Sequence, residues 1–287
     1  MVTSFAGMRN PFFPTATVSR LRILPLVGLG LVGLHLALIM AVTGNVDQVV
    51  LSLLFWGAIA TQVQPQLSLG QRRSPSAQIW GAGLLALLGL VAGPLYGTAT
   101  AFVRLFPLFA FAGWSLLVRG WRGWCGWQVW ALVVALSVPP RTLPLLLETV
   151  VGMPLRVTTA AIAAFGLHWL GFEVVQQGSF IQLPAGTVDV EFACTGAALL
   201  GLLMQISVLL AAITPGQRVG RLMGFSVAIA ALLSVIRVAI MTVSVGDDAV
   251  FQFWHGSGGG QIFTLLALAI LSYLGLGRSQ QSNDGSD

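Results

Sequence analysis

Long apolar runs, separated by single or paired arginines, constrain the fold of this chain more than any other feature. Charged residues make up 8% of its 287 residues, and hydrophobic residues make up 56%. About 25% of the residues of a soluble domain are charged, so this chain has too little polar surface to be soluble in water. The apolar runs reach the roughly 20 residues that a helix needs to cross a bilayer. The sequence therefore predicts an all-α integral membrane protein.

We expect about eight transmembrane helices in one polytopic domain, residues 23–277, between a cytoplasmic segment 1–22 and a disordered polar tail 278–287. The first helix could instead be a signal peptide, because Arg20 and Arg22 precede it, but it is long for one and no clear cleavage site follows. The expected spans are residues 23–43, 48–64, 77–96, 98–118, 123–140, 195–213, 222–245 and 261–277.

The arginines predict the orientation of these helices. The net charge of +5 comes from 14 arginines against nine acids, since the chain has no lysine. Cytoplasmic loops carry an excess of basic residues, and a cytoplasmic N-terminus puts most arginines on that side: Arg9, Arg20, Arg22, Arg72, Arg73, Arg119, Arg122, Arg218, Arg221 and Arg278. Arg141 and Arg156 lie on the outer side of the membrane in this orientation, and Arg104 and Arg237 lie within spans. We therefore expect a multi-pass protein of the plasma membrane.

One long outer connection, residues 139–194, joins the fifth and sixth spans. Its segment 157–170 is apolar but short, and we expect an interfacial or re-entrant helix there, because a ninth span would break the arginine pattern. Apolar and acidic residues then alternate around a Pro-Ala-Gly turn at residues 184–186. This period of two predicts a small hairpin on the outer face, leading to Cys194.

Cys194 lies where this hairpin ends and the sixth span begins. A helix N-terminus stabilises the thiolate, which is the nucleophilic form of cysteine, and Gly196 would let a substrate backbone approach closely. The alternative is that Cys194 is a small apolar residue. That is how we interpret Cys125, which lies in a tryptophan-rich segment at the inner end of the fifth span and cannot reach Cys194 for a disulfide.

Two arginines lie within spans, where a charge is costly and marks a functional candidate. Arg237 interrupts the apolar run 222–245. It lies ~12 Å of helix rise below the outer end, so its side chain can reach the outer interface. Arg104 lies at a similar depth in its own span and could line the same cavity. The alternatives are contact with lipid headgroups or another helix for Arg237, and an interfacial position for Arg104.

His255 lies on the outer side between the last two spans. Histidine exchanges a proton near neutral pH, the glycines that follow predict a flexible approach loop, and Trp254 would anchor this loop at the interface. The orientation places Cys194, the upper part of Arg237 and His255 on one side of the membrane. A nucleophile, a cation for an oxyanion and a proton carrier are the parts that acyl transfer requires.

The sequence gives no sign of a cofactor or of nucleic acid binding. It lacks paired metal-ligand spacings, the HExxH motif, the serine elbow, the P-loop and the dinucleotide fingerprint. Its arginines form small groups rather than a stripe beside aromatic residues, so lipid is the expected partner. We interpret His35, within the first span, and His168, on the expected interfacial helix, as structural; an isolated structural residue is also the alternative for His255.

The sequence resembles the exosortase/archaeosortase family of membrane transpeptidases over about residues 20–277. The matching motifs are GSFIQLPAGTVDVEFACTG around Cys194, SVIRVAIM around Arg237 and WHGSGGGQIF around His255. The last motif resembles the cyanobacterial subgroup, the cyanoexosortases. In one departure, Ser234 stands where the family usually has an asparagine, three residues before the arginine.

The resemblance implies an enzyme that cleaves a C-terminal sorting tail from exported proteins. Such a tail has a short Pro-Glu-Pro type motif, a transmembrane helix and a basic cluster. Cys194 would attack the scissile carbonyl at the outer face and form an acyl-enzyme, Arg237 would hold the oxyanion, and His255 would pass the proton to the leaving amine. An acceptor that the sequence does not identify would then release the protein.

A transporter or scaffold is the competing hypothesis. It would bind an anionic solute through Arg104 and Arg237, with glycine-rich helices packed closely. It leaves Cys194 without a role, and the sequence shows no repeat of broken helices.

Overall fold

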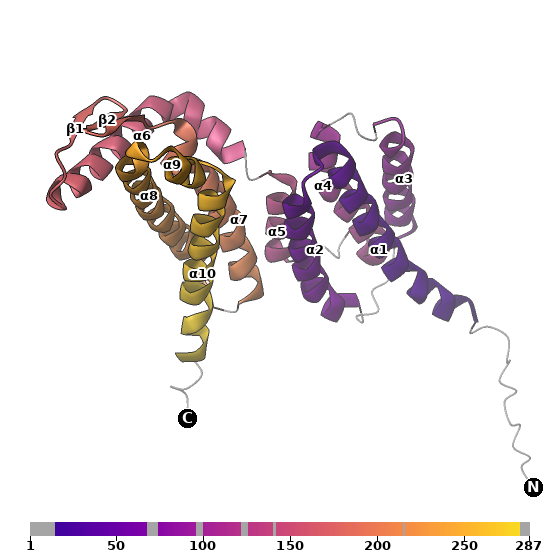
Figure 1. Ribbon diagram of the computed structural model, residues 1–287. Coiled ribbons are helices and arrows are strands. Elements are labelled where there is room, and N and C mark those ends of the chain that lie inside the picture. The colour runs from indigo at the N-terminus through magenta and orange to yellow at the C-terminus, as the bar shows by residue number, and fades with distance from the viewer. Residues whose placement is uncertain are drawn as a thin grey trace, which may run out of the picture. The chain divides into compact units, whose positions relative to one another are not determined.

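The computed structural model describes residues 15–67, 74–95, 100–121, 126–139, 142–214 and 216–281, with side chains between Leu24 and Leu276 of these ranges. Its described part is helical apart from one small sheet, and it divides into two compact units (Figure 1). Seven of the described helices are long and apolar enough to cross a membrane. The prediction of an all-α integral membrane protein is confirmed. Several residues named above lie outside the described ranges: Arg9, Arg72, Arg73, Arg122, Cys125 and Arg141.

The first unit consists mainly of four apolar helices, α1 (Thr15–Thr43), α2 (Val46–Leu67), α3 (Pro75–Ala92) and α4 (Thr100–Arg119). α3 and α4 approach each other closely at two glycines. A Cβ atom added at Gly81 would lie 2.7 Å from the carbonyl oxygen of Gly113, and one at Gly113 would lie 2.8 Å from Leu85 Cδ2. Small residues therefore set the distance between these helices, as is usual in membrane interfaces.

His35 is buried in the first unit, where its side chain is part of the packing. Its Nδ1 accepts a hydrogen bond from Trp56 Nε1 at 3.0 Å, and its ring stacks on Phe106 with centroids 5.7 Å apart. These contacts agree with the structural role that the sequence predicts.

The second unit begins at Trp127 and contains the rest of the chain, together with a short piece of α2. Its elements are α5 (Trp127–Ser137), α6 (Thr142–Trp169), β1 (Val175–Gln177), β2 (Phe180–Leu183), β3 (Gly186–Asp189), the 3-10 turn η1 (Phe192–Thr195), α7 (Ala197–Ile213), α8 (Val219–Val243), the 3-10 turn η2 (Ser244–Gly246), α9 (Asp248–His255) and α10 (Ser257–Gln281).

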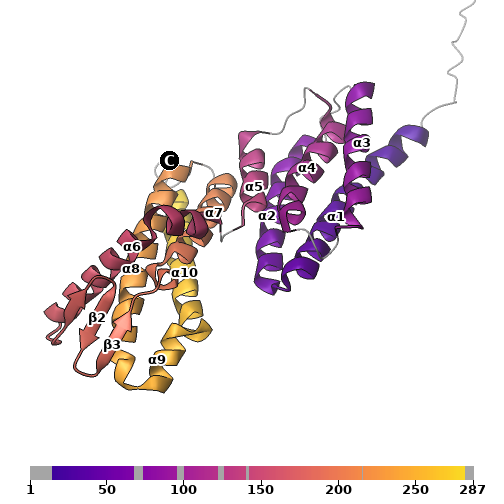
Figure 2. The ribbon, with the colours of Figure 1, turned by 90° about the horizontal axis from the view of Figure 1, so that it is seen from above.

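The predicted hairpin is present as β2 and β3, and the sequence analysis missed a third strand, β1. The three strands are antiparallel in the order β1-β2-β3, with Ile181 opposite Val188. Figure 2 shows the sheet beside α6 and α8. Ile181, Val188 and Val190 are buried, while Gln182 and Asp189 are exposed, so the alternation of apolar and polar residues gives the sheet one face that packs on the helices.

The connection before the hairpin differs from the prediction. Instead of a short helix over 157–170, the structure has α6, which is 28 residues long and consists of two helical segments that meet at a kink at Val151. α6 is long and apolar enough to cross a membrane. The predicted boundaries are wrong because Glu148 and Arg156 do not interrupt the helix. Glu148 is exposed, and Arg156 is paired with Asp189 of β3.

Two expected spans are shorter in the structure than in the prediction. α5 has 11 residues and α7 has 17, hence about 16 and 25 Å of helix against the roughly 30 Å of hydrocarbon. Pro139 follows α5 and limits its extension. The buried side chain of Gln205 on α7 donates hydrogen bonds to the carbonyls of Ala135 and Val138, at the end of α5.

The glycines after His255 form a tight corner rather than the predicted flexible loop. α9 ends at His255 and α10 begins at Ser257. A Cβ atom at Gly259 would lie 2.7 Å from the Cα of Trp254, so the close packing of the two helices requires a glycine. α10 also continues through residues 278–281, which we expected in a disordered tail, and residues 282–287 lie outside the described ranges.

The close approach of α3 and α4 predicts a stability defect in Gly81→Ala. The added methyl group overlaps backbone atoms of α4, so we expect a loss of about 1–3 kcal/mol. The melting temperature of the purified protein in detergent measures it. Gly83→Ala is the matched control, because a Cβ atom there meets nothing within 4 Å. Equal melting temperatures for the two variants would contradict this packing.

Candidate active site around Arg237

Cys194 lies in η1, between the sheet and α7, with 5% of its surface exposed. Gly196 ends η1 in a left-handed conformation with φ of 77°. A Cβ atom at Gly196 would lie 1.9 Å from Ser234 Oγ and 2.9 Å from the carbonyl oxygen of Ala230. Gly196 therefore lets η1 pack against α8, which differs from the predicted approach of a substrate backbone.

An apolar cluster surrounds the Cys194 thiol. Its buried members are Ala160, Ala163, Ala164, Ile181, Val190, Val238 and Met241, and Trp254 packs against it. These residues come from α6, β2, the segment after β3, α8 and α9. Segments far apart in the sequence thus meet at Cys194.

The environment of Cys194 disfavours its thiolate. Burial raises the pKa of the thiol; the positive charge of Arg237 lowers this pKa and the negative charge of Glu191 raises it, both by less than burial does. Burial is therefore the largest of the three effects on the pKa of this thiol. A thiol in this position needs a base before it can act as a nucleophile.

Arg237 lies on α8 and binds the end of α9 through two hydrogen bonds. Its Nε donates to the carbonyl of Trp254 at 3.1 Å, and its Nη2 donates to the carbonyl of His255 at 2.8 Å. The guanidinium also lies against Gly260, in the first turn of α10. Cations favour the C-terminal end of a helix, where carbonyls lack intrahelical partners. Within the described residues, Nη1 of Arg237 has no hydrogen-bond partner.

His255 is exposed at the end of α9. Its imidazole stacks on Phe251 with ring centroids 5.6 Å apart and an angle of 7° between the planes. Phe251 in turn packs against the cluster that contains Cys194. No hydrogen bond of the imidazole is found among the described residues. The structure therefore brings the backbone of His255 to Arg237, while its side chain lies on Phe251.

The remaining predicted residues lie in different surroundings. Trp254 is half-buried and packs against the cluster around Cys194 and against Phe263, rather than anchoring a loop. Arg104 is exposed on α4, in the first unit, and makes no hydrogen bond or ion pair with a described residue. Ser234, at the position where the family usually has an asparagine, is buried and donates to the carbonyl of Ala230 at 2.6 Å.

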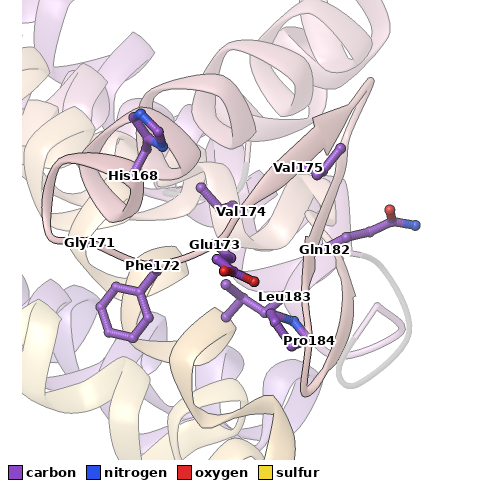
Figure 3. A pocket seen from close by; sticks show the side chains of 9 residues that line it. All are labelled: His168, Gly171, Phe172, Glu173, Val174, Val175, Gln182, Leu183 and Pro184. Carbon is purple, nitrogen blue, oxygen red and sulfur yellow. The ribbon is translucent and has the colours of Figure 1, made fainter.

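A pocket of about 600 Å³ lies elsewhere in the second unit, at the end of the sheet (Figure 3). It lies between the end of α6 and the hairpin turn, and its lining residues are His168, Gly171, Phe172, Glu173, Val174, Val175, Gln182, Leu183 and Pro184. None of the residues discussed above for acyl transfer is among them. His168, predicted to be structural, is exposed there. The described residues contain no group of three or more His, Cys, Asp or Glu side chains that could hold a metal ion.

A polar network that the sequence does not predict lies beside the site. Arg156 of α6 binds the end of β3 through Asp189 and the carbonyl of Val190. A signal for this network was present in the sequence, because Arg156 is one of two arginines that the orientation rule leaves on the outer side.

Comparison with known protein families identifies the chain. A family model described as transmembrane exosortase matches residues 44–272, which include Cys194, Arg237 and His255. This chain belongs to the transmembrane exosortase family. Members of this family are membrane transpeptidases that act on exported proteins with C-terminal sorting signals, and this activity is favoured over the transporter hypothesis. Searches of curated proteins and of solved structures find no match to the chain.

The charges around Cys194 predict opposite effects for two variants of this exosortase. Arg237→Gln removes the charge that lowers the thiol pKa, so less thiolate forms at a given pH and alkylation of Cys194 becomes slower. Glu191→Gln removes a charge that raises the pKa, so alkylation becomes faster. The measurement is the rate of alkylation by a small membrane-permeable thiol reagent from pH 7 to 9, in a Cys125→Ala background. Glu173→Gln should leave this rate unchanged, and shifts of the same sign in both variants would contradict the assignment.

Proposed function

We propose that Cys194, Arg237 and His255 of this exosortase cleave and transfer sorting tails by covalent catalysis. The observation that carries the proposal is the position of Arg237. Its guanidinium binds the carbonyl of His255, and its charge acts on the thiol of Cys194. Arg237 thus interacts both with the segment that carries His255 and with Cys194.

The proposed reaction begins with proton transfer from the buried thiol. The imidazole of His255 takes the proton, which requires it to leave its stack on Phe251, and the sulfur of Cys194 attacks the scissile carbonyl. Nη1 of Arg237, which is unpaired within the described residues, would donate to the oxyanion. The carbon–nitrogen bond of the substrate then breaks, and the leaving amine takes the proton from His255. This leaves a thioester on Cys194, as acyl transfer requires.

The second half of the proposed reaction releases the product. An acceptor nucleophile, which nothing in the chain identifies, attacks the thioester carbonyl and transfers its own proton to His255. The sulfur of Cys194 leaves and is protonated again. The enzyme returns to its starting state without a cofactor.

The finer features of the proposal rest on the sequence motifs. We assign the substrate a Pro-Glu-Pro type tail with a transmembrane helix and a basic cluster, and we assign the enzyme to the cyanobacterial subgroup because of its WHGSGGGQIF motif. The positions of the arginines support a plasma-membrane protein with a cytoplasmic N-terminus and its active site at the outer face. This orientation requires that only one of α5 and α6 crosses the membrane, and α6 is the longer of the two. Membrane lipid then surrounds both the enzyme and the tail.

Substitution of the three residues tests the proposed catalysis. Each enzyme variant is co-expressed with an exported reporter that carries such a tail, and the cleaved fraction is measured on immunoblots. Cys194→Ala should abolish cleavage, and Arg237→Ala should reduce its rate at least about 100-fold, as loss of an oxyanion donor does. Arg237→Lys should also be poor, because an ammonium does not reproduce the planar array of guanidinium donors. His255→Ala should reduce the rate about 100-fold or more.

The control for this experiment is the second cysteine. Cys125→Ala should cleave the reporter at the rate of the unmodified enzyme. Cleavage that survives in Cys194→Ala would eliminate the proposed mechanism.

A labelling experiment tests the proposed orientation separately. Ala185, in the exposed turn of the hairpin, is replaced by cysteine in a Cys125→Ala/Cys194→Ala background. A membrane-impermeant maleimide should label Ala185→Cys in intact spheroplasts. Labelling only in inverted vesicles would place the sheet in the cytoplasm and overturn the orientation.

A further inference from the structure

Arg156 fixes the end of the small sheet to α6. Its Nε donates to the carbonyl oxygen of Val190 at 2.7 Å, and its Nη2 lies 2.9 Å from both carboxylate oxygens of Asp189. About a quarter of the Arg156 side chain is exposed, 26% against 39% for Asp189. Three short contacts from one guanidinium define both the position and the direction of the chain at these two residues.

Ser179 completes this network from the neighbouring strand region. Its hydroxyl donates to Asp189 Oδ1 at 2.6 Å, and its carbonyl accepts from the backbone N–H of Val190 at 2.9 Å. Ser179 is buried, with 3% of its surface exposed. The carboxylate of Asp189 is therefore held from α6 on one side and from the start of β2 on the other.

The network lies where the chain leaves the sheet and turns toward the thiol. β3 ends at Asp189, and η1, which contains Cys194, begins at Phe192. The residues between them have no strand partner beyond the bond from Val190 to Ser179. Without Arg156, the bonds to Ser179 would still hold Asp189 and Val190 to the sheet, but no hydrogen bond would tie these two residues to α6. Only apolar contacts, which have no preferred direction, would remain there.

The helix that carries Arg156 also forms one wall of the thiol cluster. Ala160 and Ala163, one and two turns after Arg156, are fully buried against it. The distance between α6 and η1 therefore depends on both the alanine wall and the guanidinium. A change in this distance moves the Cys194 thiol relative to Arg237 on α8.

We propose that Arg156 is a positioning residue of this exosortase: its bonds to Asp189 and Val190 hold the end of β3 on α6 and so place the Cys194 thiol beside Arg237. This inference rests on the proposed catalytic role of Cys194. Arg156 itself contacts no reacting atom. It also accounts for an arginine that the orientation rule leaves unexplained.

The test uses the full-length enzyme in membranes, in a Cys125→Ala background. Arg156→Gln removes the ion pair and shortens the side chain. We expect kcat for tail cleavage to fall at least about tenfold with KM within about twofold, since a displaced reacting group costs rate rather than binding. Alkylation of Cys194 should become several-fold faster, because the freed η1 exposes the thiol.

Conservative variants separate positioning from general stability. Arg156→Lys keeps the ion pair but not the bond to Val190, so its kcat and alkylation rate should lie between those of the parent and Arg156→Gln. Asp189→Asn removes the ion pair but keeps the bond from Arg156 to Val190. Its effect should be smaller than that of Arg156→Lys, which loses the bond to Val190. Glu173→Gln and Arg218→Gln change exposed charges of the same unit and should match the parent in both measurements.

Two outcomes would overturn the inference. One is an unchanged kcat and an unchanged alkylation rate in Arg156→Gln. The other is an equal loss of kcat in Arg156→Lys and Arg156→Gln, together with an equal drop in their melting temperatures. If Arg156→Gln does not accumulate in the membrane, Asp189→Asn decides by the same measurements. Alkylation needs no turnover, so failure of the proposed function, seen as cleavage by Cys194→Ala, remains distinguishable from failure of the positioning role.

Discussion

The guanidinium of Arg237 is the group around which the second unit is organised. It interrupts the apolar run 222–245 of α8, and an arginine at the centre of a membrane-spanning helix costs about 2.5–3.5 kcal/mol on insertion scales. The carbonyls of Trp254 and His255, at the C-terminal end of α9, satisfy two of its donors. These two hydrogen bonds from the half-buried Arg237 hold the end of α9 against α8. The turn from α9 into α10 requires a glycine at Gly259, where a Cβ atom would lie 2.7 Å from the Cα of Trp254.

A second arginine, Arg156, has a comparable role on α6, which packs on the same cluster as α8. Arg156 connects α6 to the sheet, and the sheet delivers Cys194 to the cluster between α6 and α8. In both places the arginine binds backbone carbonyls of a segment that carries a residue of the proposed site. The membrane protein uses few charges, so each one that is paired within the protein has a large effect on geometry. The apolar packing around Cys194 adds close contact but no direction, and it raises the pKa of the thiol.

Several errors of the sequence analysis have a common cause. In a sequence, a charged or glycine-rich stretch indicates the end of a helix or a loop, because water is the usual partner of such residues. In the structure, Arg156 continues α6 because Asp189 and Val190 satisfy it. Residue 259 lies in α10 and is a glycine because the backbone of Trp254 is too close for a side chain. The same reasoning succeeded at the hairpin, where a period of two and a turn are local signals, and it missed β1, whose three residues have no clear alternation.

The sequence by itself determined that this protein lies in a membrane, that it is mostly helical, that a hairpin precedes Cys194 and to which family it belongs. These follow from composition, local periodicity and motif order, none of which needs a partner far along the chain. The tertiary structure alone decided the surroundings of those motifs: the burial that disfavours the Cys194 thiolate, the bonds between Arg237 and the end of α9, and the attachment of the sheet to α6. The physical reason is that desolvation and hydrogen bonding depend on which distant segments meet. Arg156 and Arg237 interrupt apolar runs in the sequence, but in the structure each binds backbone carbonyls of another segment and holds that segment in place.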